Sequence, residues 1–526
     1  MTSERVDLER FRLRSFVERL AASGELEVHE EPVPLGDLSA IIEATSKATL
    51  FKKAGPCQRE LVAAVSGSRR RIAAAFDSDT RMLTREVMRR IGTPQPVIEV
   101  ASKDAPVHAV VRTGDQVDLT TLPFHLQHAE DGGLYISSAL DFTVDPQSGK
   151  RNVGCRRLML RSRNETTTNL TNVSDLQRML KACLDRGERL PVSFVVGSHP
   201  TDFCAAQLQV PVDEFGLVAN VRGGPLPLVR GITNGVLAPA DAEVILEGYL
   251  DERGYQEMDG PYGEFWGYYG GMHIDPIFHV TAITMRSDAL HQTVLHGGAI
   301  MSRMETSQMT AIIAEIVATR ALSAAGIEPA ALYAVPSAPI FQHIRVALRR
   351  ADAGKAQAAI DALFNSIGGK HVTVVDDDVD VFSDEDVEWA MATRFRADRD
   401  LVTGTGYRGF YEDPTADSEG KIAKMGFDAT AKHSASKINR RRPKPPKLNG
   451  TAACKTVREA LASGPKRFME IMEAVGSRDG IDVTLALTAL SKDGGLVRLP
   501  DGEYALKGRE DDAAQPERAL TRPAEK

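Results

Sequence analysis

The sequence has few cysteines, and none lies in a paired motif. Its five cysteines are scattered through 526 residues without a C-x-x-C pair. This pattern fits neither a disulfide framework nor a zinc site built from thiolates. We therefore expect most of the cysteines to be inert core residues.

Long apolar runs and an excess of positive charge are also missing. No run of about 18 apolar residues occurs, which argues against a membrane-spanning helix, and the N-terminus is charged from Glu4 onward. We expect a cytoplasmic protein with no membrane partner. The formal net charge of -8 gives no global electrostatic reason to bind nucleic acid, so that partner is not expected either.

The chain is otherwise of ordinary globular composition, with 42% apolar and 26% charged residues. Its length predicts several domains, and its alternating helical and strand-like segments predict an α/β (α+β) fold. The alanine-rich segment 307–326, which ends in glycine, is the best long helix. We predict an N-terminal α/β region (1–110), a β-rich domain (111–305), a linking helix (306–328) and a C-terminal α/β domain (329–433).

The end of the chain has the pattern of a separate small module. Basic residues and prolines at 434–450 suit an extended linker. Three short helical patterns and a hairpin turning at Pro500-Asp501-Gly502 then predict a winged-helix-like module over 451–510, followed by a disordered tail at 511–526. The presumed recognition helix, DVTLALTALSKDGG, carries one lysine and two aspartates. This favours docking within an oligomer over contact with DNA phosphates.

Two segments carry candidate chemistry. In DGPYGEFWGYYGG (259–271), glycines permit close backbone approach, aromatic rings can wall a flat ligand, and Asp259 and Glu264 can enter one cavity. A glycine-rich surface hairpin with solvated acids is an equally good explanation. In NVGCRR (152–157), a buried arginine could hold an anionic group through a bidentate pair. The residues alone do not choose which arginine, and a solvated strand face is the alternative.

Taken in order, several motifs resemble the UbiD decarboxylase family over residues 7–433. They are DLERFRLRSFVERLAASGEL, NVGCRR, VILEGYLDERGYQEMDGPYGEFWGYY, VVDDDVDVFSDEDVEWAMATR and KMGFDATAKH. The resemblance implies a central split β-barrel that binds prenylated FMN, a linking helix, and a C-terminal domain for assembly into a homodimer or higher homo-oligomer. It also implies a flavin prenyltransferase as supplier of the cofactor.

The resemblance also implies site residues. Glu264 is the acid and base, Arg157 positions substrate and cofactor, and Asp259, where the family usually has glutamate, locks Arg157. Burial among aromatic residues is expected to move the pKa of Glu264 toward neutrality, with Arg157 paired mainly to Asp259. The implied cofactor-binding residues are Asn152, Val153, Gly154, Cys155, Arg156, Arg157, Ser174, Asp175 and Lys424.

The implied metal site departs from the family pattern. Relatives place a divalent ion, Mn²⁺ or Mg²⁺, among an Asn, His and Glu trio, with a monovalent ion such as K⁺ nearby. Asn152 matches, but Asp175 stands at the histidine position and Gly224 at the glutamate position. Asp175 is a suitable oxygen ligand. We therefore expect metal ligation by Asn152 and Asp175. At the third position either water replaces the glutamate or the alignment is displaced by a few residues.

Three histidines are candidates for a functional role. His296, in VLHGGAIMSR, lies where the resemblance implies a substrate-pocket residue, although a structural role is the commoner use of a lone histidine. His125 and His128, in FHLQH, form a weak metal pair, and solvated loop residues are favoured there.

The resemblance implies reversible, non-oxidative decarboxylation of an aromatic or heteroaromatic acid, releasing CO₂, with prenylated FMN as the electron sink. Two alternatives remain open at this point. One is an ordinary FMN-binding oxidoreductase, and the other is a winged-helix regulatory protein.

Overall fold

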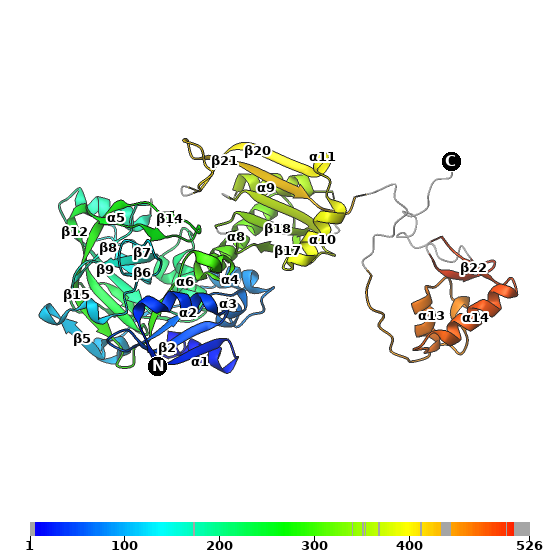
Figure 1. Ribbon diagram of the computed structural model, residues 1–526, viewed down its shortest axis with the longest axis horizontal. Coiled ribbons are helices and arrows are strands. Elements are labelled where there is room, and N and C mark those ends of the chain that lie inside the picture. Colours follow the sequence, from blue (N-terminus) through cyan, green and yellow to red (C-terminus); the bar gives the residue numbers. More distant parts are fainter. Residues whose placement is uncertain are drawn as a thin grey trace. The chain divides into compact units, whose positions relative to one another are not determined.

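A computed structural model describes residues 6–171, 174–338, 340–349, 352, 354–366, 369–410, 413–432, 443–500 and 502–509 (Figure 1). The chain divides into two compact units, Met1–Lys432 and His433–Lys526. Most of the predicted linker and all of the predicted disordered tail lie outside the described residues. The predicted α/β (α+β) fold class is confirmed.

The N-terminal region is a four-stranded sheet with helices beside it. Helix α1 (Leu13–Ala22) buries Leu13, Phe16, Val17 and Leu20, the apolar positions at helical spacing. The sheet order is β1-β2-β3-β16, and β16 joins β3 in parallel although it lies far along the chain. Its elements are β1 (Leu26–Val33), α2 (Leu38–Ala44), β2 (Ala48–Ala54), β3 (Arg59–Ala63), α3 (Arg69–Ala75), α4 (Leu83–Ile91) and β16 (His291–Thr293).

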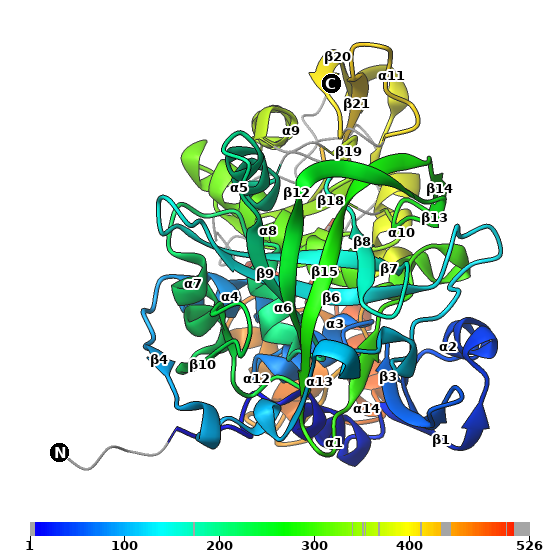
Figure 2. The same cartoon turned by 90° about the vertical axis from the view of Figure 1, so that its left-hand side faces the viewer.

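The central domain is a closed antiparallel barrel. Its sheet has the order β12-β9-β6-β7-β8-β15-β5. A further pairing of β12 with β15 closes the strands from β12 to β15 into a ring, and β5 pairs with β15 outside it. Figure 2 shows the two long strands β12 and β15 side by side. The strands are β5 (Val110–Thr113), β6 (Tyr135–Val144), β7 (Arg151–Leu160), β8 (Glu165–Thr168), β9 (Leu190–Val196), β12 (Val244–Asp259) and β15 (His273–Met285).

Helices and a small sheet cover the barrel and position its loops. Arg222, at the end of α7, is buried and pairs with Asp202 and Asp241 at 2.6 and 2.7 Å. The elements are β4 (Val97–Glu99), α5 (Asp175–Leu184), α6 (Pro200–Ala206), α7 (Glu214–Arg222), β10 (Leu226–Arg230) and β11 (Leu237–Pro239). Among the described residues, no helix has the length and apolar character needed to cross a membrane.

Helix α8 (Glu305–Ala324) runs from the barrel to the C-terminal sheet and packs on β17 and α9. The sheet order is β17-β18-β19-β21-β20, with parallel pairing only at its centre. Its elements are β17 (Pro329–Ala334), β18 (His343–Leu348), α9 (Ala356–Ser366), β19 (His371–Asp376), α10 (Asp384–Arg394), α11 (Ala397–Asp400), β20 (Leu401–Arg408) and β21 (Lys421–Asp428).

Within its described residues, 443–500 and 502–509, the second unit has three helices and a two-stranded sheet; that the unit is a winged-helix-like module stays a prediction. The elements are α12 (Val457–Ala462), α13 (Phe468–Val475), α14 (Ile481–Lys492), β22 (Leu496–Arg498) and β23 (Tyr504–Leu506). A small core holds them together, formed by Val457, Leu461, Ile471, Val483, Leu487 and Leu490. Asp501, in the predicted turn, lies outside the described residues.

Candidate active site

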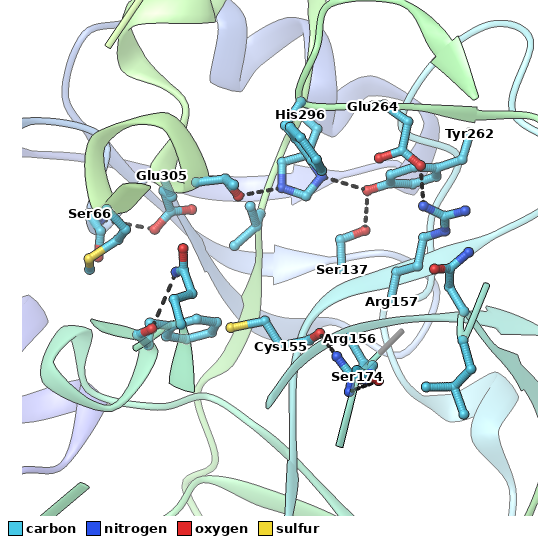
Figure 3. Close-up of a pocket in the computed structure, with 18 residues that line it drawn as sticks. Ser66, Ser137, Cys155, Arg156, Arg157, Ser174, Tyr262, Glu264, His296 and Glu305 are labelled. Carbon is cyan, nitrogen blue, oxygen red and sulfur yellow. Dashed lines mark hydrogen bonds and ion pairs between the residues drawn. The ribbon is translucent and has the colours of Figure 1, made fainter. Parts of the chain in front are cut away.

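A cavity of about 240 Å³ opens where the barrel, the glycine-rich segment and the start of α8 meet. Figure 3 shows Arg157 and Glu264 on one side of it, Glu305 and Ser66 on the other, and His296 between them. The lining residues come from segments far apart in sequence. They are Ser66, Ser137, Cys155, Arg156, Arg157, Asn169, Leu170, Ser174, Phe203, Gln207, Tyr262, Glu264, Phe265, Val294, His296, Glu305, Thr306 and Met309.

The glycine-rich segment forms a short hairpin, β13 (Tyr262–Gly263) and β14 (Tyr269–Gly270), directly after β12. Gly267 turns the chain with φ +81°, and a Cβ at Gly270 would lie 3.1 Å from Glu264 Cγ. The glycines thus leave room for the carboxylate. Tyr262 and Phe265 line the cavity, whereas Tyr268 is 66% exposed, so only part of the aromatic cluster walls the site.

Arg157 is the central cation of the site. Its Nη1 donates to Glu264 Oε1 in a close contact, and its guanidinium lies 4.4 Å from the centre of the Tyr262 ring. Burial opposes the charged form, but the carboxylates of Glu264 and Asp259 outweigh it and raise the pKa of Arg157. The arginine therefore stays charged, and the structure brings Arg157 and Glu264, two residues that the sequence marks for the site, into direct contact.

Asp259 contacts Arg157 less closely than expected. It is fully buried at the end of β12, where it accepts hydrogen bonds from Tyr135 (3.2 Å) and Thr167. Its nearest contact with Arg157 Nη2 is 3.7 Å. The expectation that Arg157 pairs mainly with Asp259 is therefore wrong, because Glu264 is the closer acid and Asp259 is held by hydroxyl groups.

The closer partner of Arg157 Nη2 is His273, at 3.1 Å, which the sequence analysis missed. His273 lies opposite Asp259 in the pairing of β15 with β12, and Asp275 follows two residues later on the same face. The H-x-D spacing at the start of a strand was the available signal. Recognising it required the register between two distant strands.

His296 belongs to a hydrogen-bonded row on the cavity wall. Its Nδ1 lies 3.1 Å from the Tyr262 hydroxyl and its Nε2 lies 2.7 Å from Thr306 Oγ1. Tyr262 in turn contacts Ser137 Oγ at 2.6 Å. Burial lowers the pKa of His296 to about 3, so the ring is neutral at physiological pH.

Glu305, the first residue of α8, is a second cavity carboxyl that the sequence analysis missed. One oxygen accepts a hydrogen bond from the Ser66 amide at 2.9 Å, while Oε2 is buried with no hydrogen-bond partner among the described residues. Burial raises its pKa to about 7. No motif marks it, because only the fold brings α8 beside the loop after β3.

The predicted cofactor-binding segment forms most of β7. Cys155, Arg156 and Arg157 line the cavity, as does Ser174 at the start of α5. Arg156 pairs with buried Asp141 at 3.1 Å and donates to Ser174 Oγ at 3.4 Å. Gly154 is needed here, since a Cβ would lie 2.8 Å from Asp141 Oδ1. Val153 is not among the cavity-lining residues, and its backbone N–H donates to Oε2 of Glu214 at 2.6 Å.

The residues expected to hold a divalent metal differ in how far other groups of the protein engage them. The amide nitrogen of Asn152 donates to Asp141, and Asp175 is bound by Lys150 (2.6 Å) and Arg178. Gly224 supplies no ligand, and a Cβ there would meet the Phe11 ring at 3.0 Å. Asp175 is thus engaged by two cations of the protein, whereas Asn152 is bonded through its nitrogen and keeps Oδ1, the atom that a metal would take; ligation by Asn152 and Asp175 stays a prediction.

Lys424 and the histidine pair complete the set of residues expected from the sequence. Lys424, on β21, donates to the Phe364 carbonyl at 2.8 Å within the C-terminal domain and is not among the cavity-lining residues. His125 is 1% exposed, and burial lowers its pKa to about 4, so the expected solvated loop histidine is wrong. His128 packs edge-on against Tyr262 with ring centres 6.5 Å apart.

Comparisons with known proteins agree with this architecture. Residues 98–299 match the family model for the 3-octaprenyl-4-hydroxybenzoate carboxy-lyase Rift-related domain, and residues 307–429 match the model for the C-terminal domain of the same carboxy-lyase. Anhydromevalonate phosphate decarboxylase of Methanosarcina mazei is 30% identical over 428 residues, covering 79% of this chain and 95% of that protein.

Two solved structures are similar over most of the chain. The UbiD-class enzyme HmfF of Pelotomaculum thermopropionicum, in complex with FMN, has a TM-score of 0.77 at 28% identity, covering 84% of this chain and 98% of its own. The 3,4-dihydroxybenzoic acid decarboxylase AroY of Klebsiella pneumoniae has a TM-score of 0.74 at 25% identity, covering 83% and 97%. With its barrel, its C-terminal domain and its buried Arg157–Glu264 pair, the chain belongs to the UbiD family of carboxy-lyases.

Proposed function

We propose that this carboxy-lyase reversibly decarboxylates an aromatic or heteroaromatic acid with the aid of prenylated FMN. The observation that carries the proposal is the buried pair of Arg157 and Glu264 in a cavity of a barrel whose solved relatives hold flavin. HmfF is described in complex with FMN, and an evolved dimeric form of it, 27% identical with a TM-score of 0.73, in complex with prFMN.

The cavity residues suit such a cofactor. Arg156 and Ser174 offer donors for an anionic group, and Nε of Arg157 is buried with no hydrogen-bond partner among the described residues. Bound prenylated FMN supplies the electron sink for the charge left on the ring carbon when CO₂ departs, which side chains alone cannot provide. A flavin prenyltransferase is the proposed supplier. Assembly as a homodimer or higher homo-oligomer is proposed as well.

Arg157 and Glu264 then have separate roles, one in binding and one in proton transfer. The guanidinium holds the substrate carboxylate by charge-assisted hydrogen bonds and orients Glu264. Glu264 carries the proton that replaces CO₂ on the ring carbon and takes it back in the reverse direction. His296 stays neutral, so it offers a ring nitrogen to a substrate polar group without adding charge. Asp259 accepts the hydrogen bond of the Tyr135 hydroxyl and so holds that side chain in place beside the site.

A second substrate class has a specific observation in its favour. Two curated relatives, one 30% identical, are anhydromevalonate phosphate decarboxylases, whose name specifies a phosphate. Arg156 lines the same cavity as Arg157, and guanidinium is well matched to phosphate. The substrate panel therefore includes an unsaturated acid that carries a phosphate.

The test uses protein made with and without a flavin prenyltransferase in the same cells. CO₂ release is measured over a panel of pyrrole, indole, furan and phenolic acids and the phosphorylated unsaturated acid, with the flavin identified by mass and absorption. We expect turnover only with the prenylated form. Full turnover with plain FMN would contradict the proposal, and turnover of the phosphorylated acid alone would replace the aromatic substrate class.

A further inference from the structure

The Nη2 side of Arg157 is held by a histidine that the acid-base pair does not explain. Nη2 lies 3.1 Å from Nε2 of His273, against 3.7 Å from the nearest oxygen of Asp259. An arginine side chain carries donors only, so Nε2 of His273 is the acceptor. His273 is thus the direct partner of the guanidinium on the side away from Glu264.

Neighbouring groups fix the ring of His273 in this state. Nδ2 of Asn169 lies 3.0 Å from Nε2 and adds a second donor there. On the other side, Nδ1 lies 2.9 Å from Oδ2 of Asp275. A neutral ring with its proton on Nδ1, the nitrogen that faces the carboxylate, accepts at Nε2. The interaction with Asp275 also raises the pKa of His273, so this acceptor is present only while the ring is neutral. Asp275 is fully buried, and its Oδ1 accepts from the Leu170 amide at 3.0 Å, which holds the carboxylate in place.

Strand register explains why β15 and not β12 supplies the acceptor. Asp259 and His273 are direct partners across the two strands, and Asp275 shares the face of His273. Both oxygens of Asp259 are taken, by Tyr135 and Thr167. His273 presents an unprotonated nitrogen at the point where Asp259 falls short of hydrogen-bonding distance.

A metal ion is the competing interpretation of this cluster. Ligand atoms of Asp259, His273 and Asp275 lie within 4.8 Å of one another, a spacing that an ion could use. The guanidinium of Arg157 already supplies the positive charge and occupies Nε2 of His273. An ion would have to displace Arg157 from the cavity wall, so we assign the cluster to the arginine.

We propose that His273 and Asp275 are positioning residues that hold Arg157 so that its Nη1 stays directed at Glu264. Asp275 orients His273, His273 holds Nη2, and Arg157 presents Glu264 to the cavity. The inference rests on the proposed function and extends it to two residues that need not touch the substrate. A displacement of about 1 Å in such an arrangement can lower turnover by about 100-fold.

The test compares three variants of the flavin-loaded enzyme. His273→Phe keeps a ring but removes the acceptor, whereas His273→Gln keeps an acceptor oxygen near the position of Nε2. His279→Phe is the matched control, because His279 lies on the same strand and contacts Asp251 at 2.7 Å rather than the cavity. We expect kcat to fall about 10- to 100-fold in His273→Phe with a smaller change in KM. His273→Gln should recover most of kcat, and His279→Phe should keep it.

Crystal structures of the variants supply a readout independent of activity. Arg157 should leave Glu264 in His273→Phe and stay in His273→Gln. If His273→Phe fails to fold, Asp275→Asn, a change of similar volume, replaces it in the test. This variant should also lower kcat. Wild-type kcat in His273→Phe, or an unmoved Arg157 in its crystal, would overturn the inference, as would a metal ion bound at this cluster. If the wild type turns over no acid, the proposed function fails while the crystals still test the positioning of Arg157.

Discussion

The carboxyl of Glu305 should make the stability of the first unit depend on pH. Burial raises its pKa from 4.5 to about 7. The unfolded chain releases this proton near pH 4.5 and the folded chain only near pH 7, so the unfolding free energy falls as pH rises between these values. Below about pH 4.5 Glu305 is protonated in both states and the unfolding free energy is at its full value. Above about pH 7 the buried carboxyl is ionised and the whole difference in unfolding free energy has been lost.

The size of this effect follows from the two pKa values. A difference of about 2.5 pH units at about 1.4 kcal/mol each amounts to about 3–4 kcal/mol. In Glu305→Gln the side chain is neutral at every pH and can still accept a hydrogen bond from the Ser66 amide. The variant should therefore not lose unfolding free energy to the ionisation of a buried carboxyl. Unfolding entropy of about 2.1 cal/mol/K per residue, taken over residues 1–432, converts this free energy into a Tm gain of about 3–4 °C above pH 7.

The assay is Tm against pH from 4.5 to 8.5 for the wild type and Glu305→Gln. The two curves should meet near pH 4.5 and separate as pH rises. Glu315→Gln is the control on the same helix, since Glu315 is buried but paired with Arg69 at 2.8 Å. Glu315→Gln should have a lower Tm than the wild type at every pH in the series. Parallel curves for the wild type and Glu305→Gln would refute the reasoning.

Three other predictions concern residues outside the cavity. Arg222→Ala leaves Asp202 and Asp241 buried without their cation and should cost about 3–5 kcal/mol in unfolding free energy; a loss under about 1 kcal/mol in denaturant titrations would contradict this. Lys424→Ala should lower Tm yet keep the flavin through dialysis, whereas loss of flavin would restore the cofactor role implied by the sequence resemblance. Truncation after Asn449 should change the assembled mass in light scattering or the Tm, and salt-sensitive binding of the isolated tail to duplex DNA would contradict a structural role.

Motifs within one segment could be predicted from the sequence. Arg157 and Glu264 each lie in a short motif of distinctive composition, and the alanine-rich run that forms α8 has strong helix propensity. The family, the fold class and the carboxy-lyase activity follow from such local patterns. The pairing of Arg157 with Glu264 instead of Asp259 could not be predicted, because it depends on where the hydroxyls of Tyr135 and Thr167 lie.

Residues that are brought together by long-range packing could not be predicted from the sequence. His273 faces Arg157 because β15 returns beside β12 in a particular register, and a shift of one residue would turn it away. Glu305 enters the cavity because α8 begins beside Ser66, 239 positions earlier in the chain. Likewise, β16 joins the N-terminal sheet, although its sequence lies within the range predicted for the barrel domain.

Glu264→Gln tests the central claim most directly. The substitution is nearly isosteric, so flavin occupancy should stay the same while the proton donor is lost. Decarboxylation by the loaded enzyme should fall by roughly 10²- to 10⁴-fold, and exchange of the substrate ring proton with deuterated solvent should fall with it. Near wild-type decarboxylation and exchange in Glu264→Gln, together with loss of both in Asp259→Asn, would contradict the assignment of Glu264 as the acid and base.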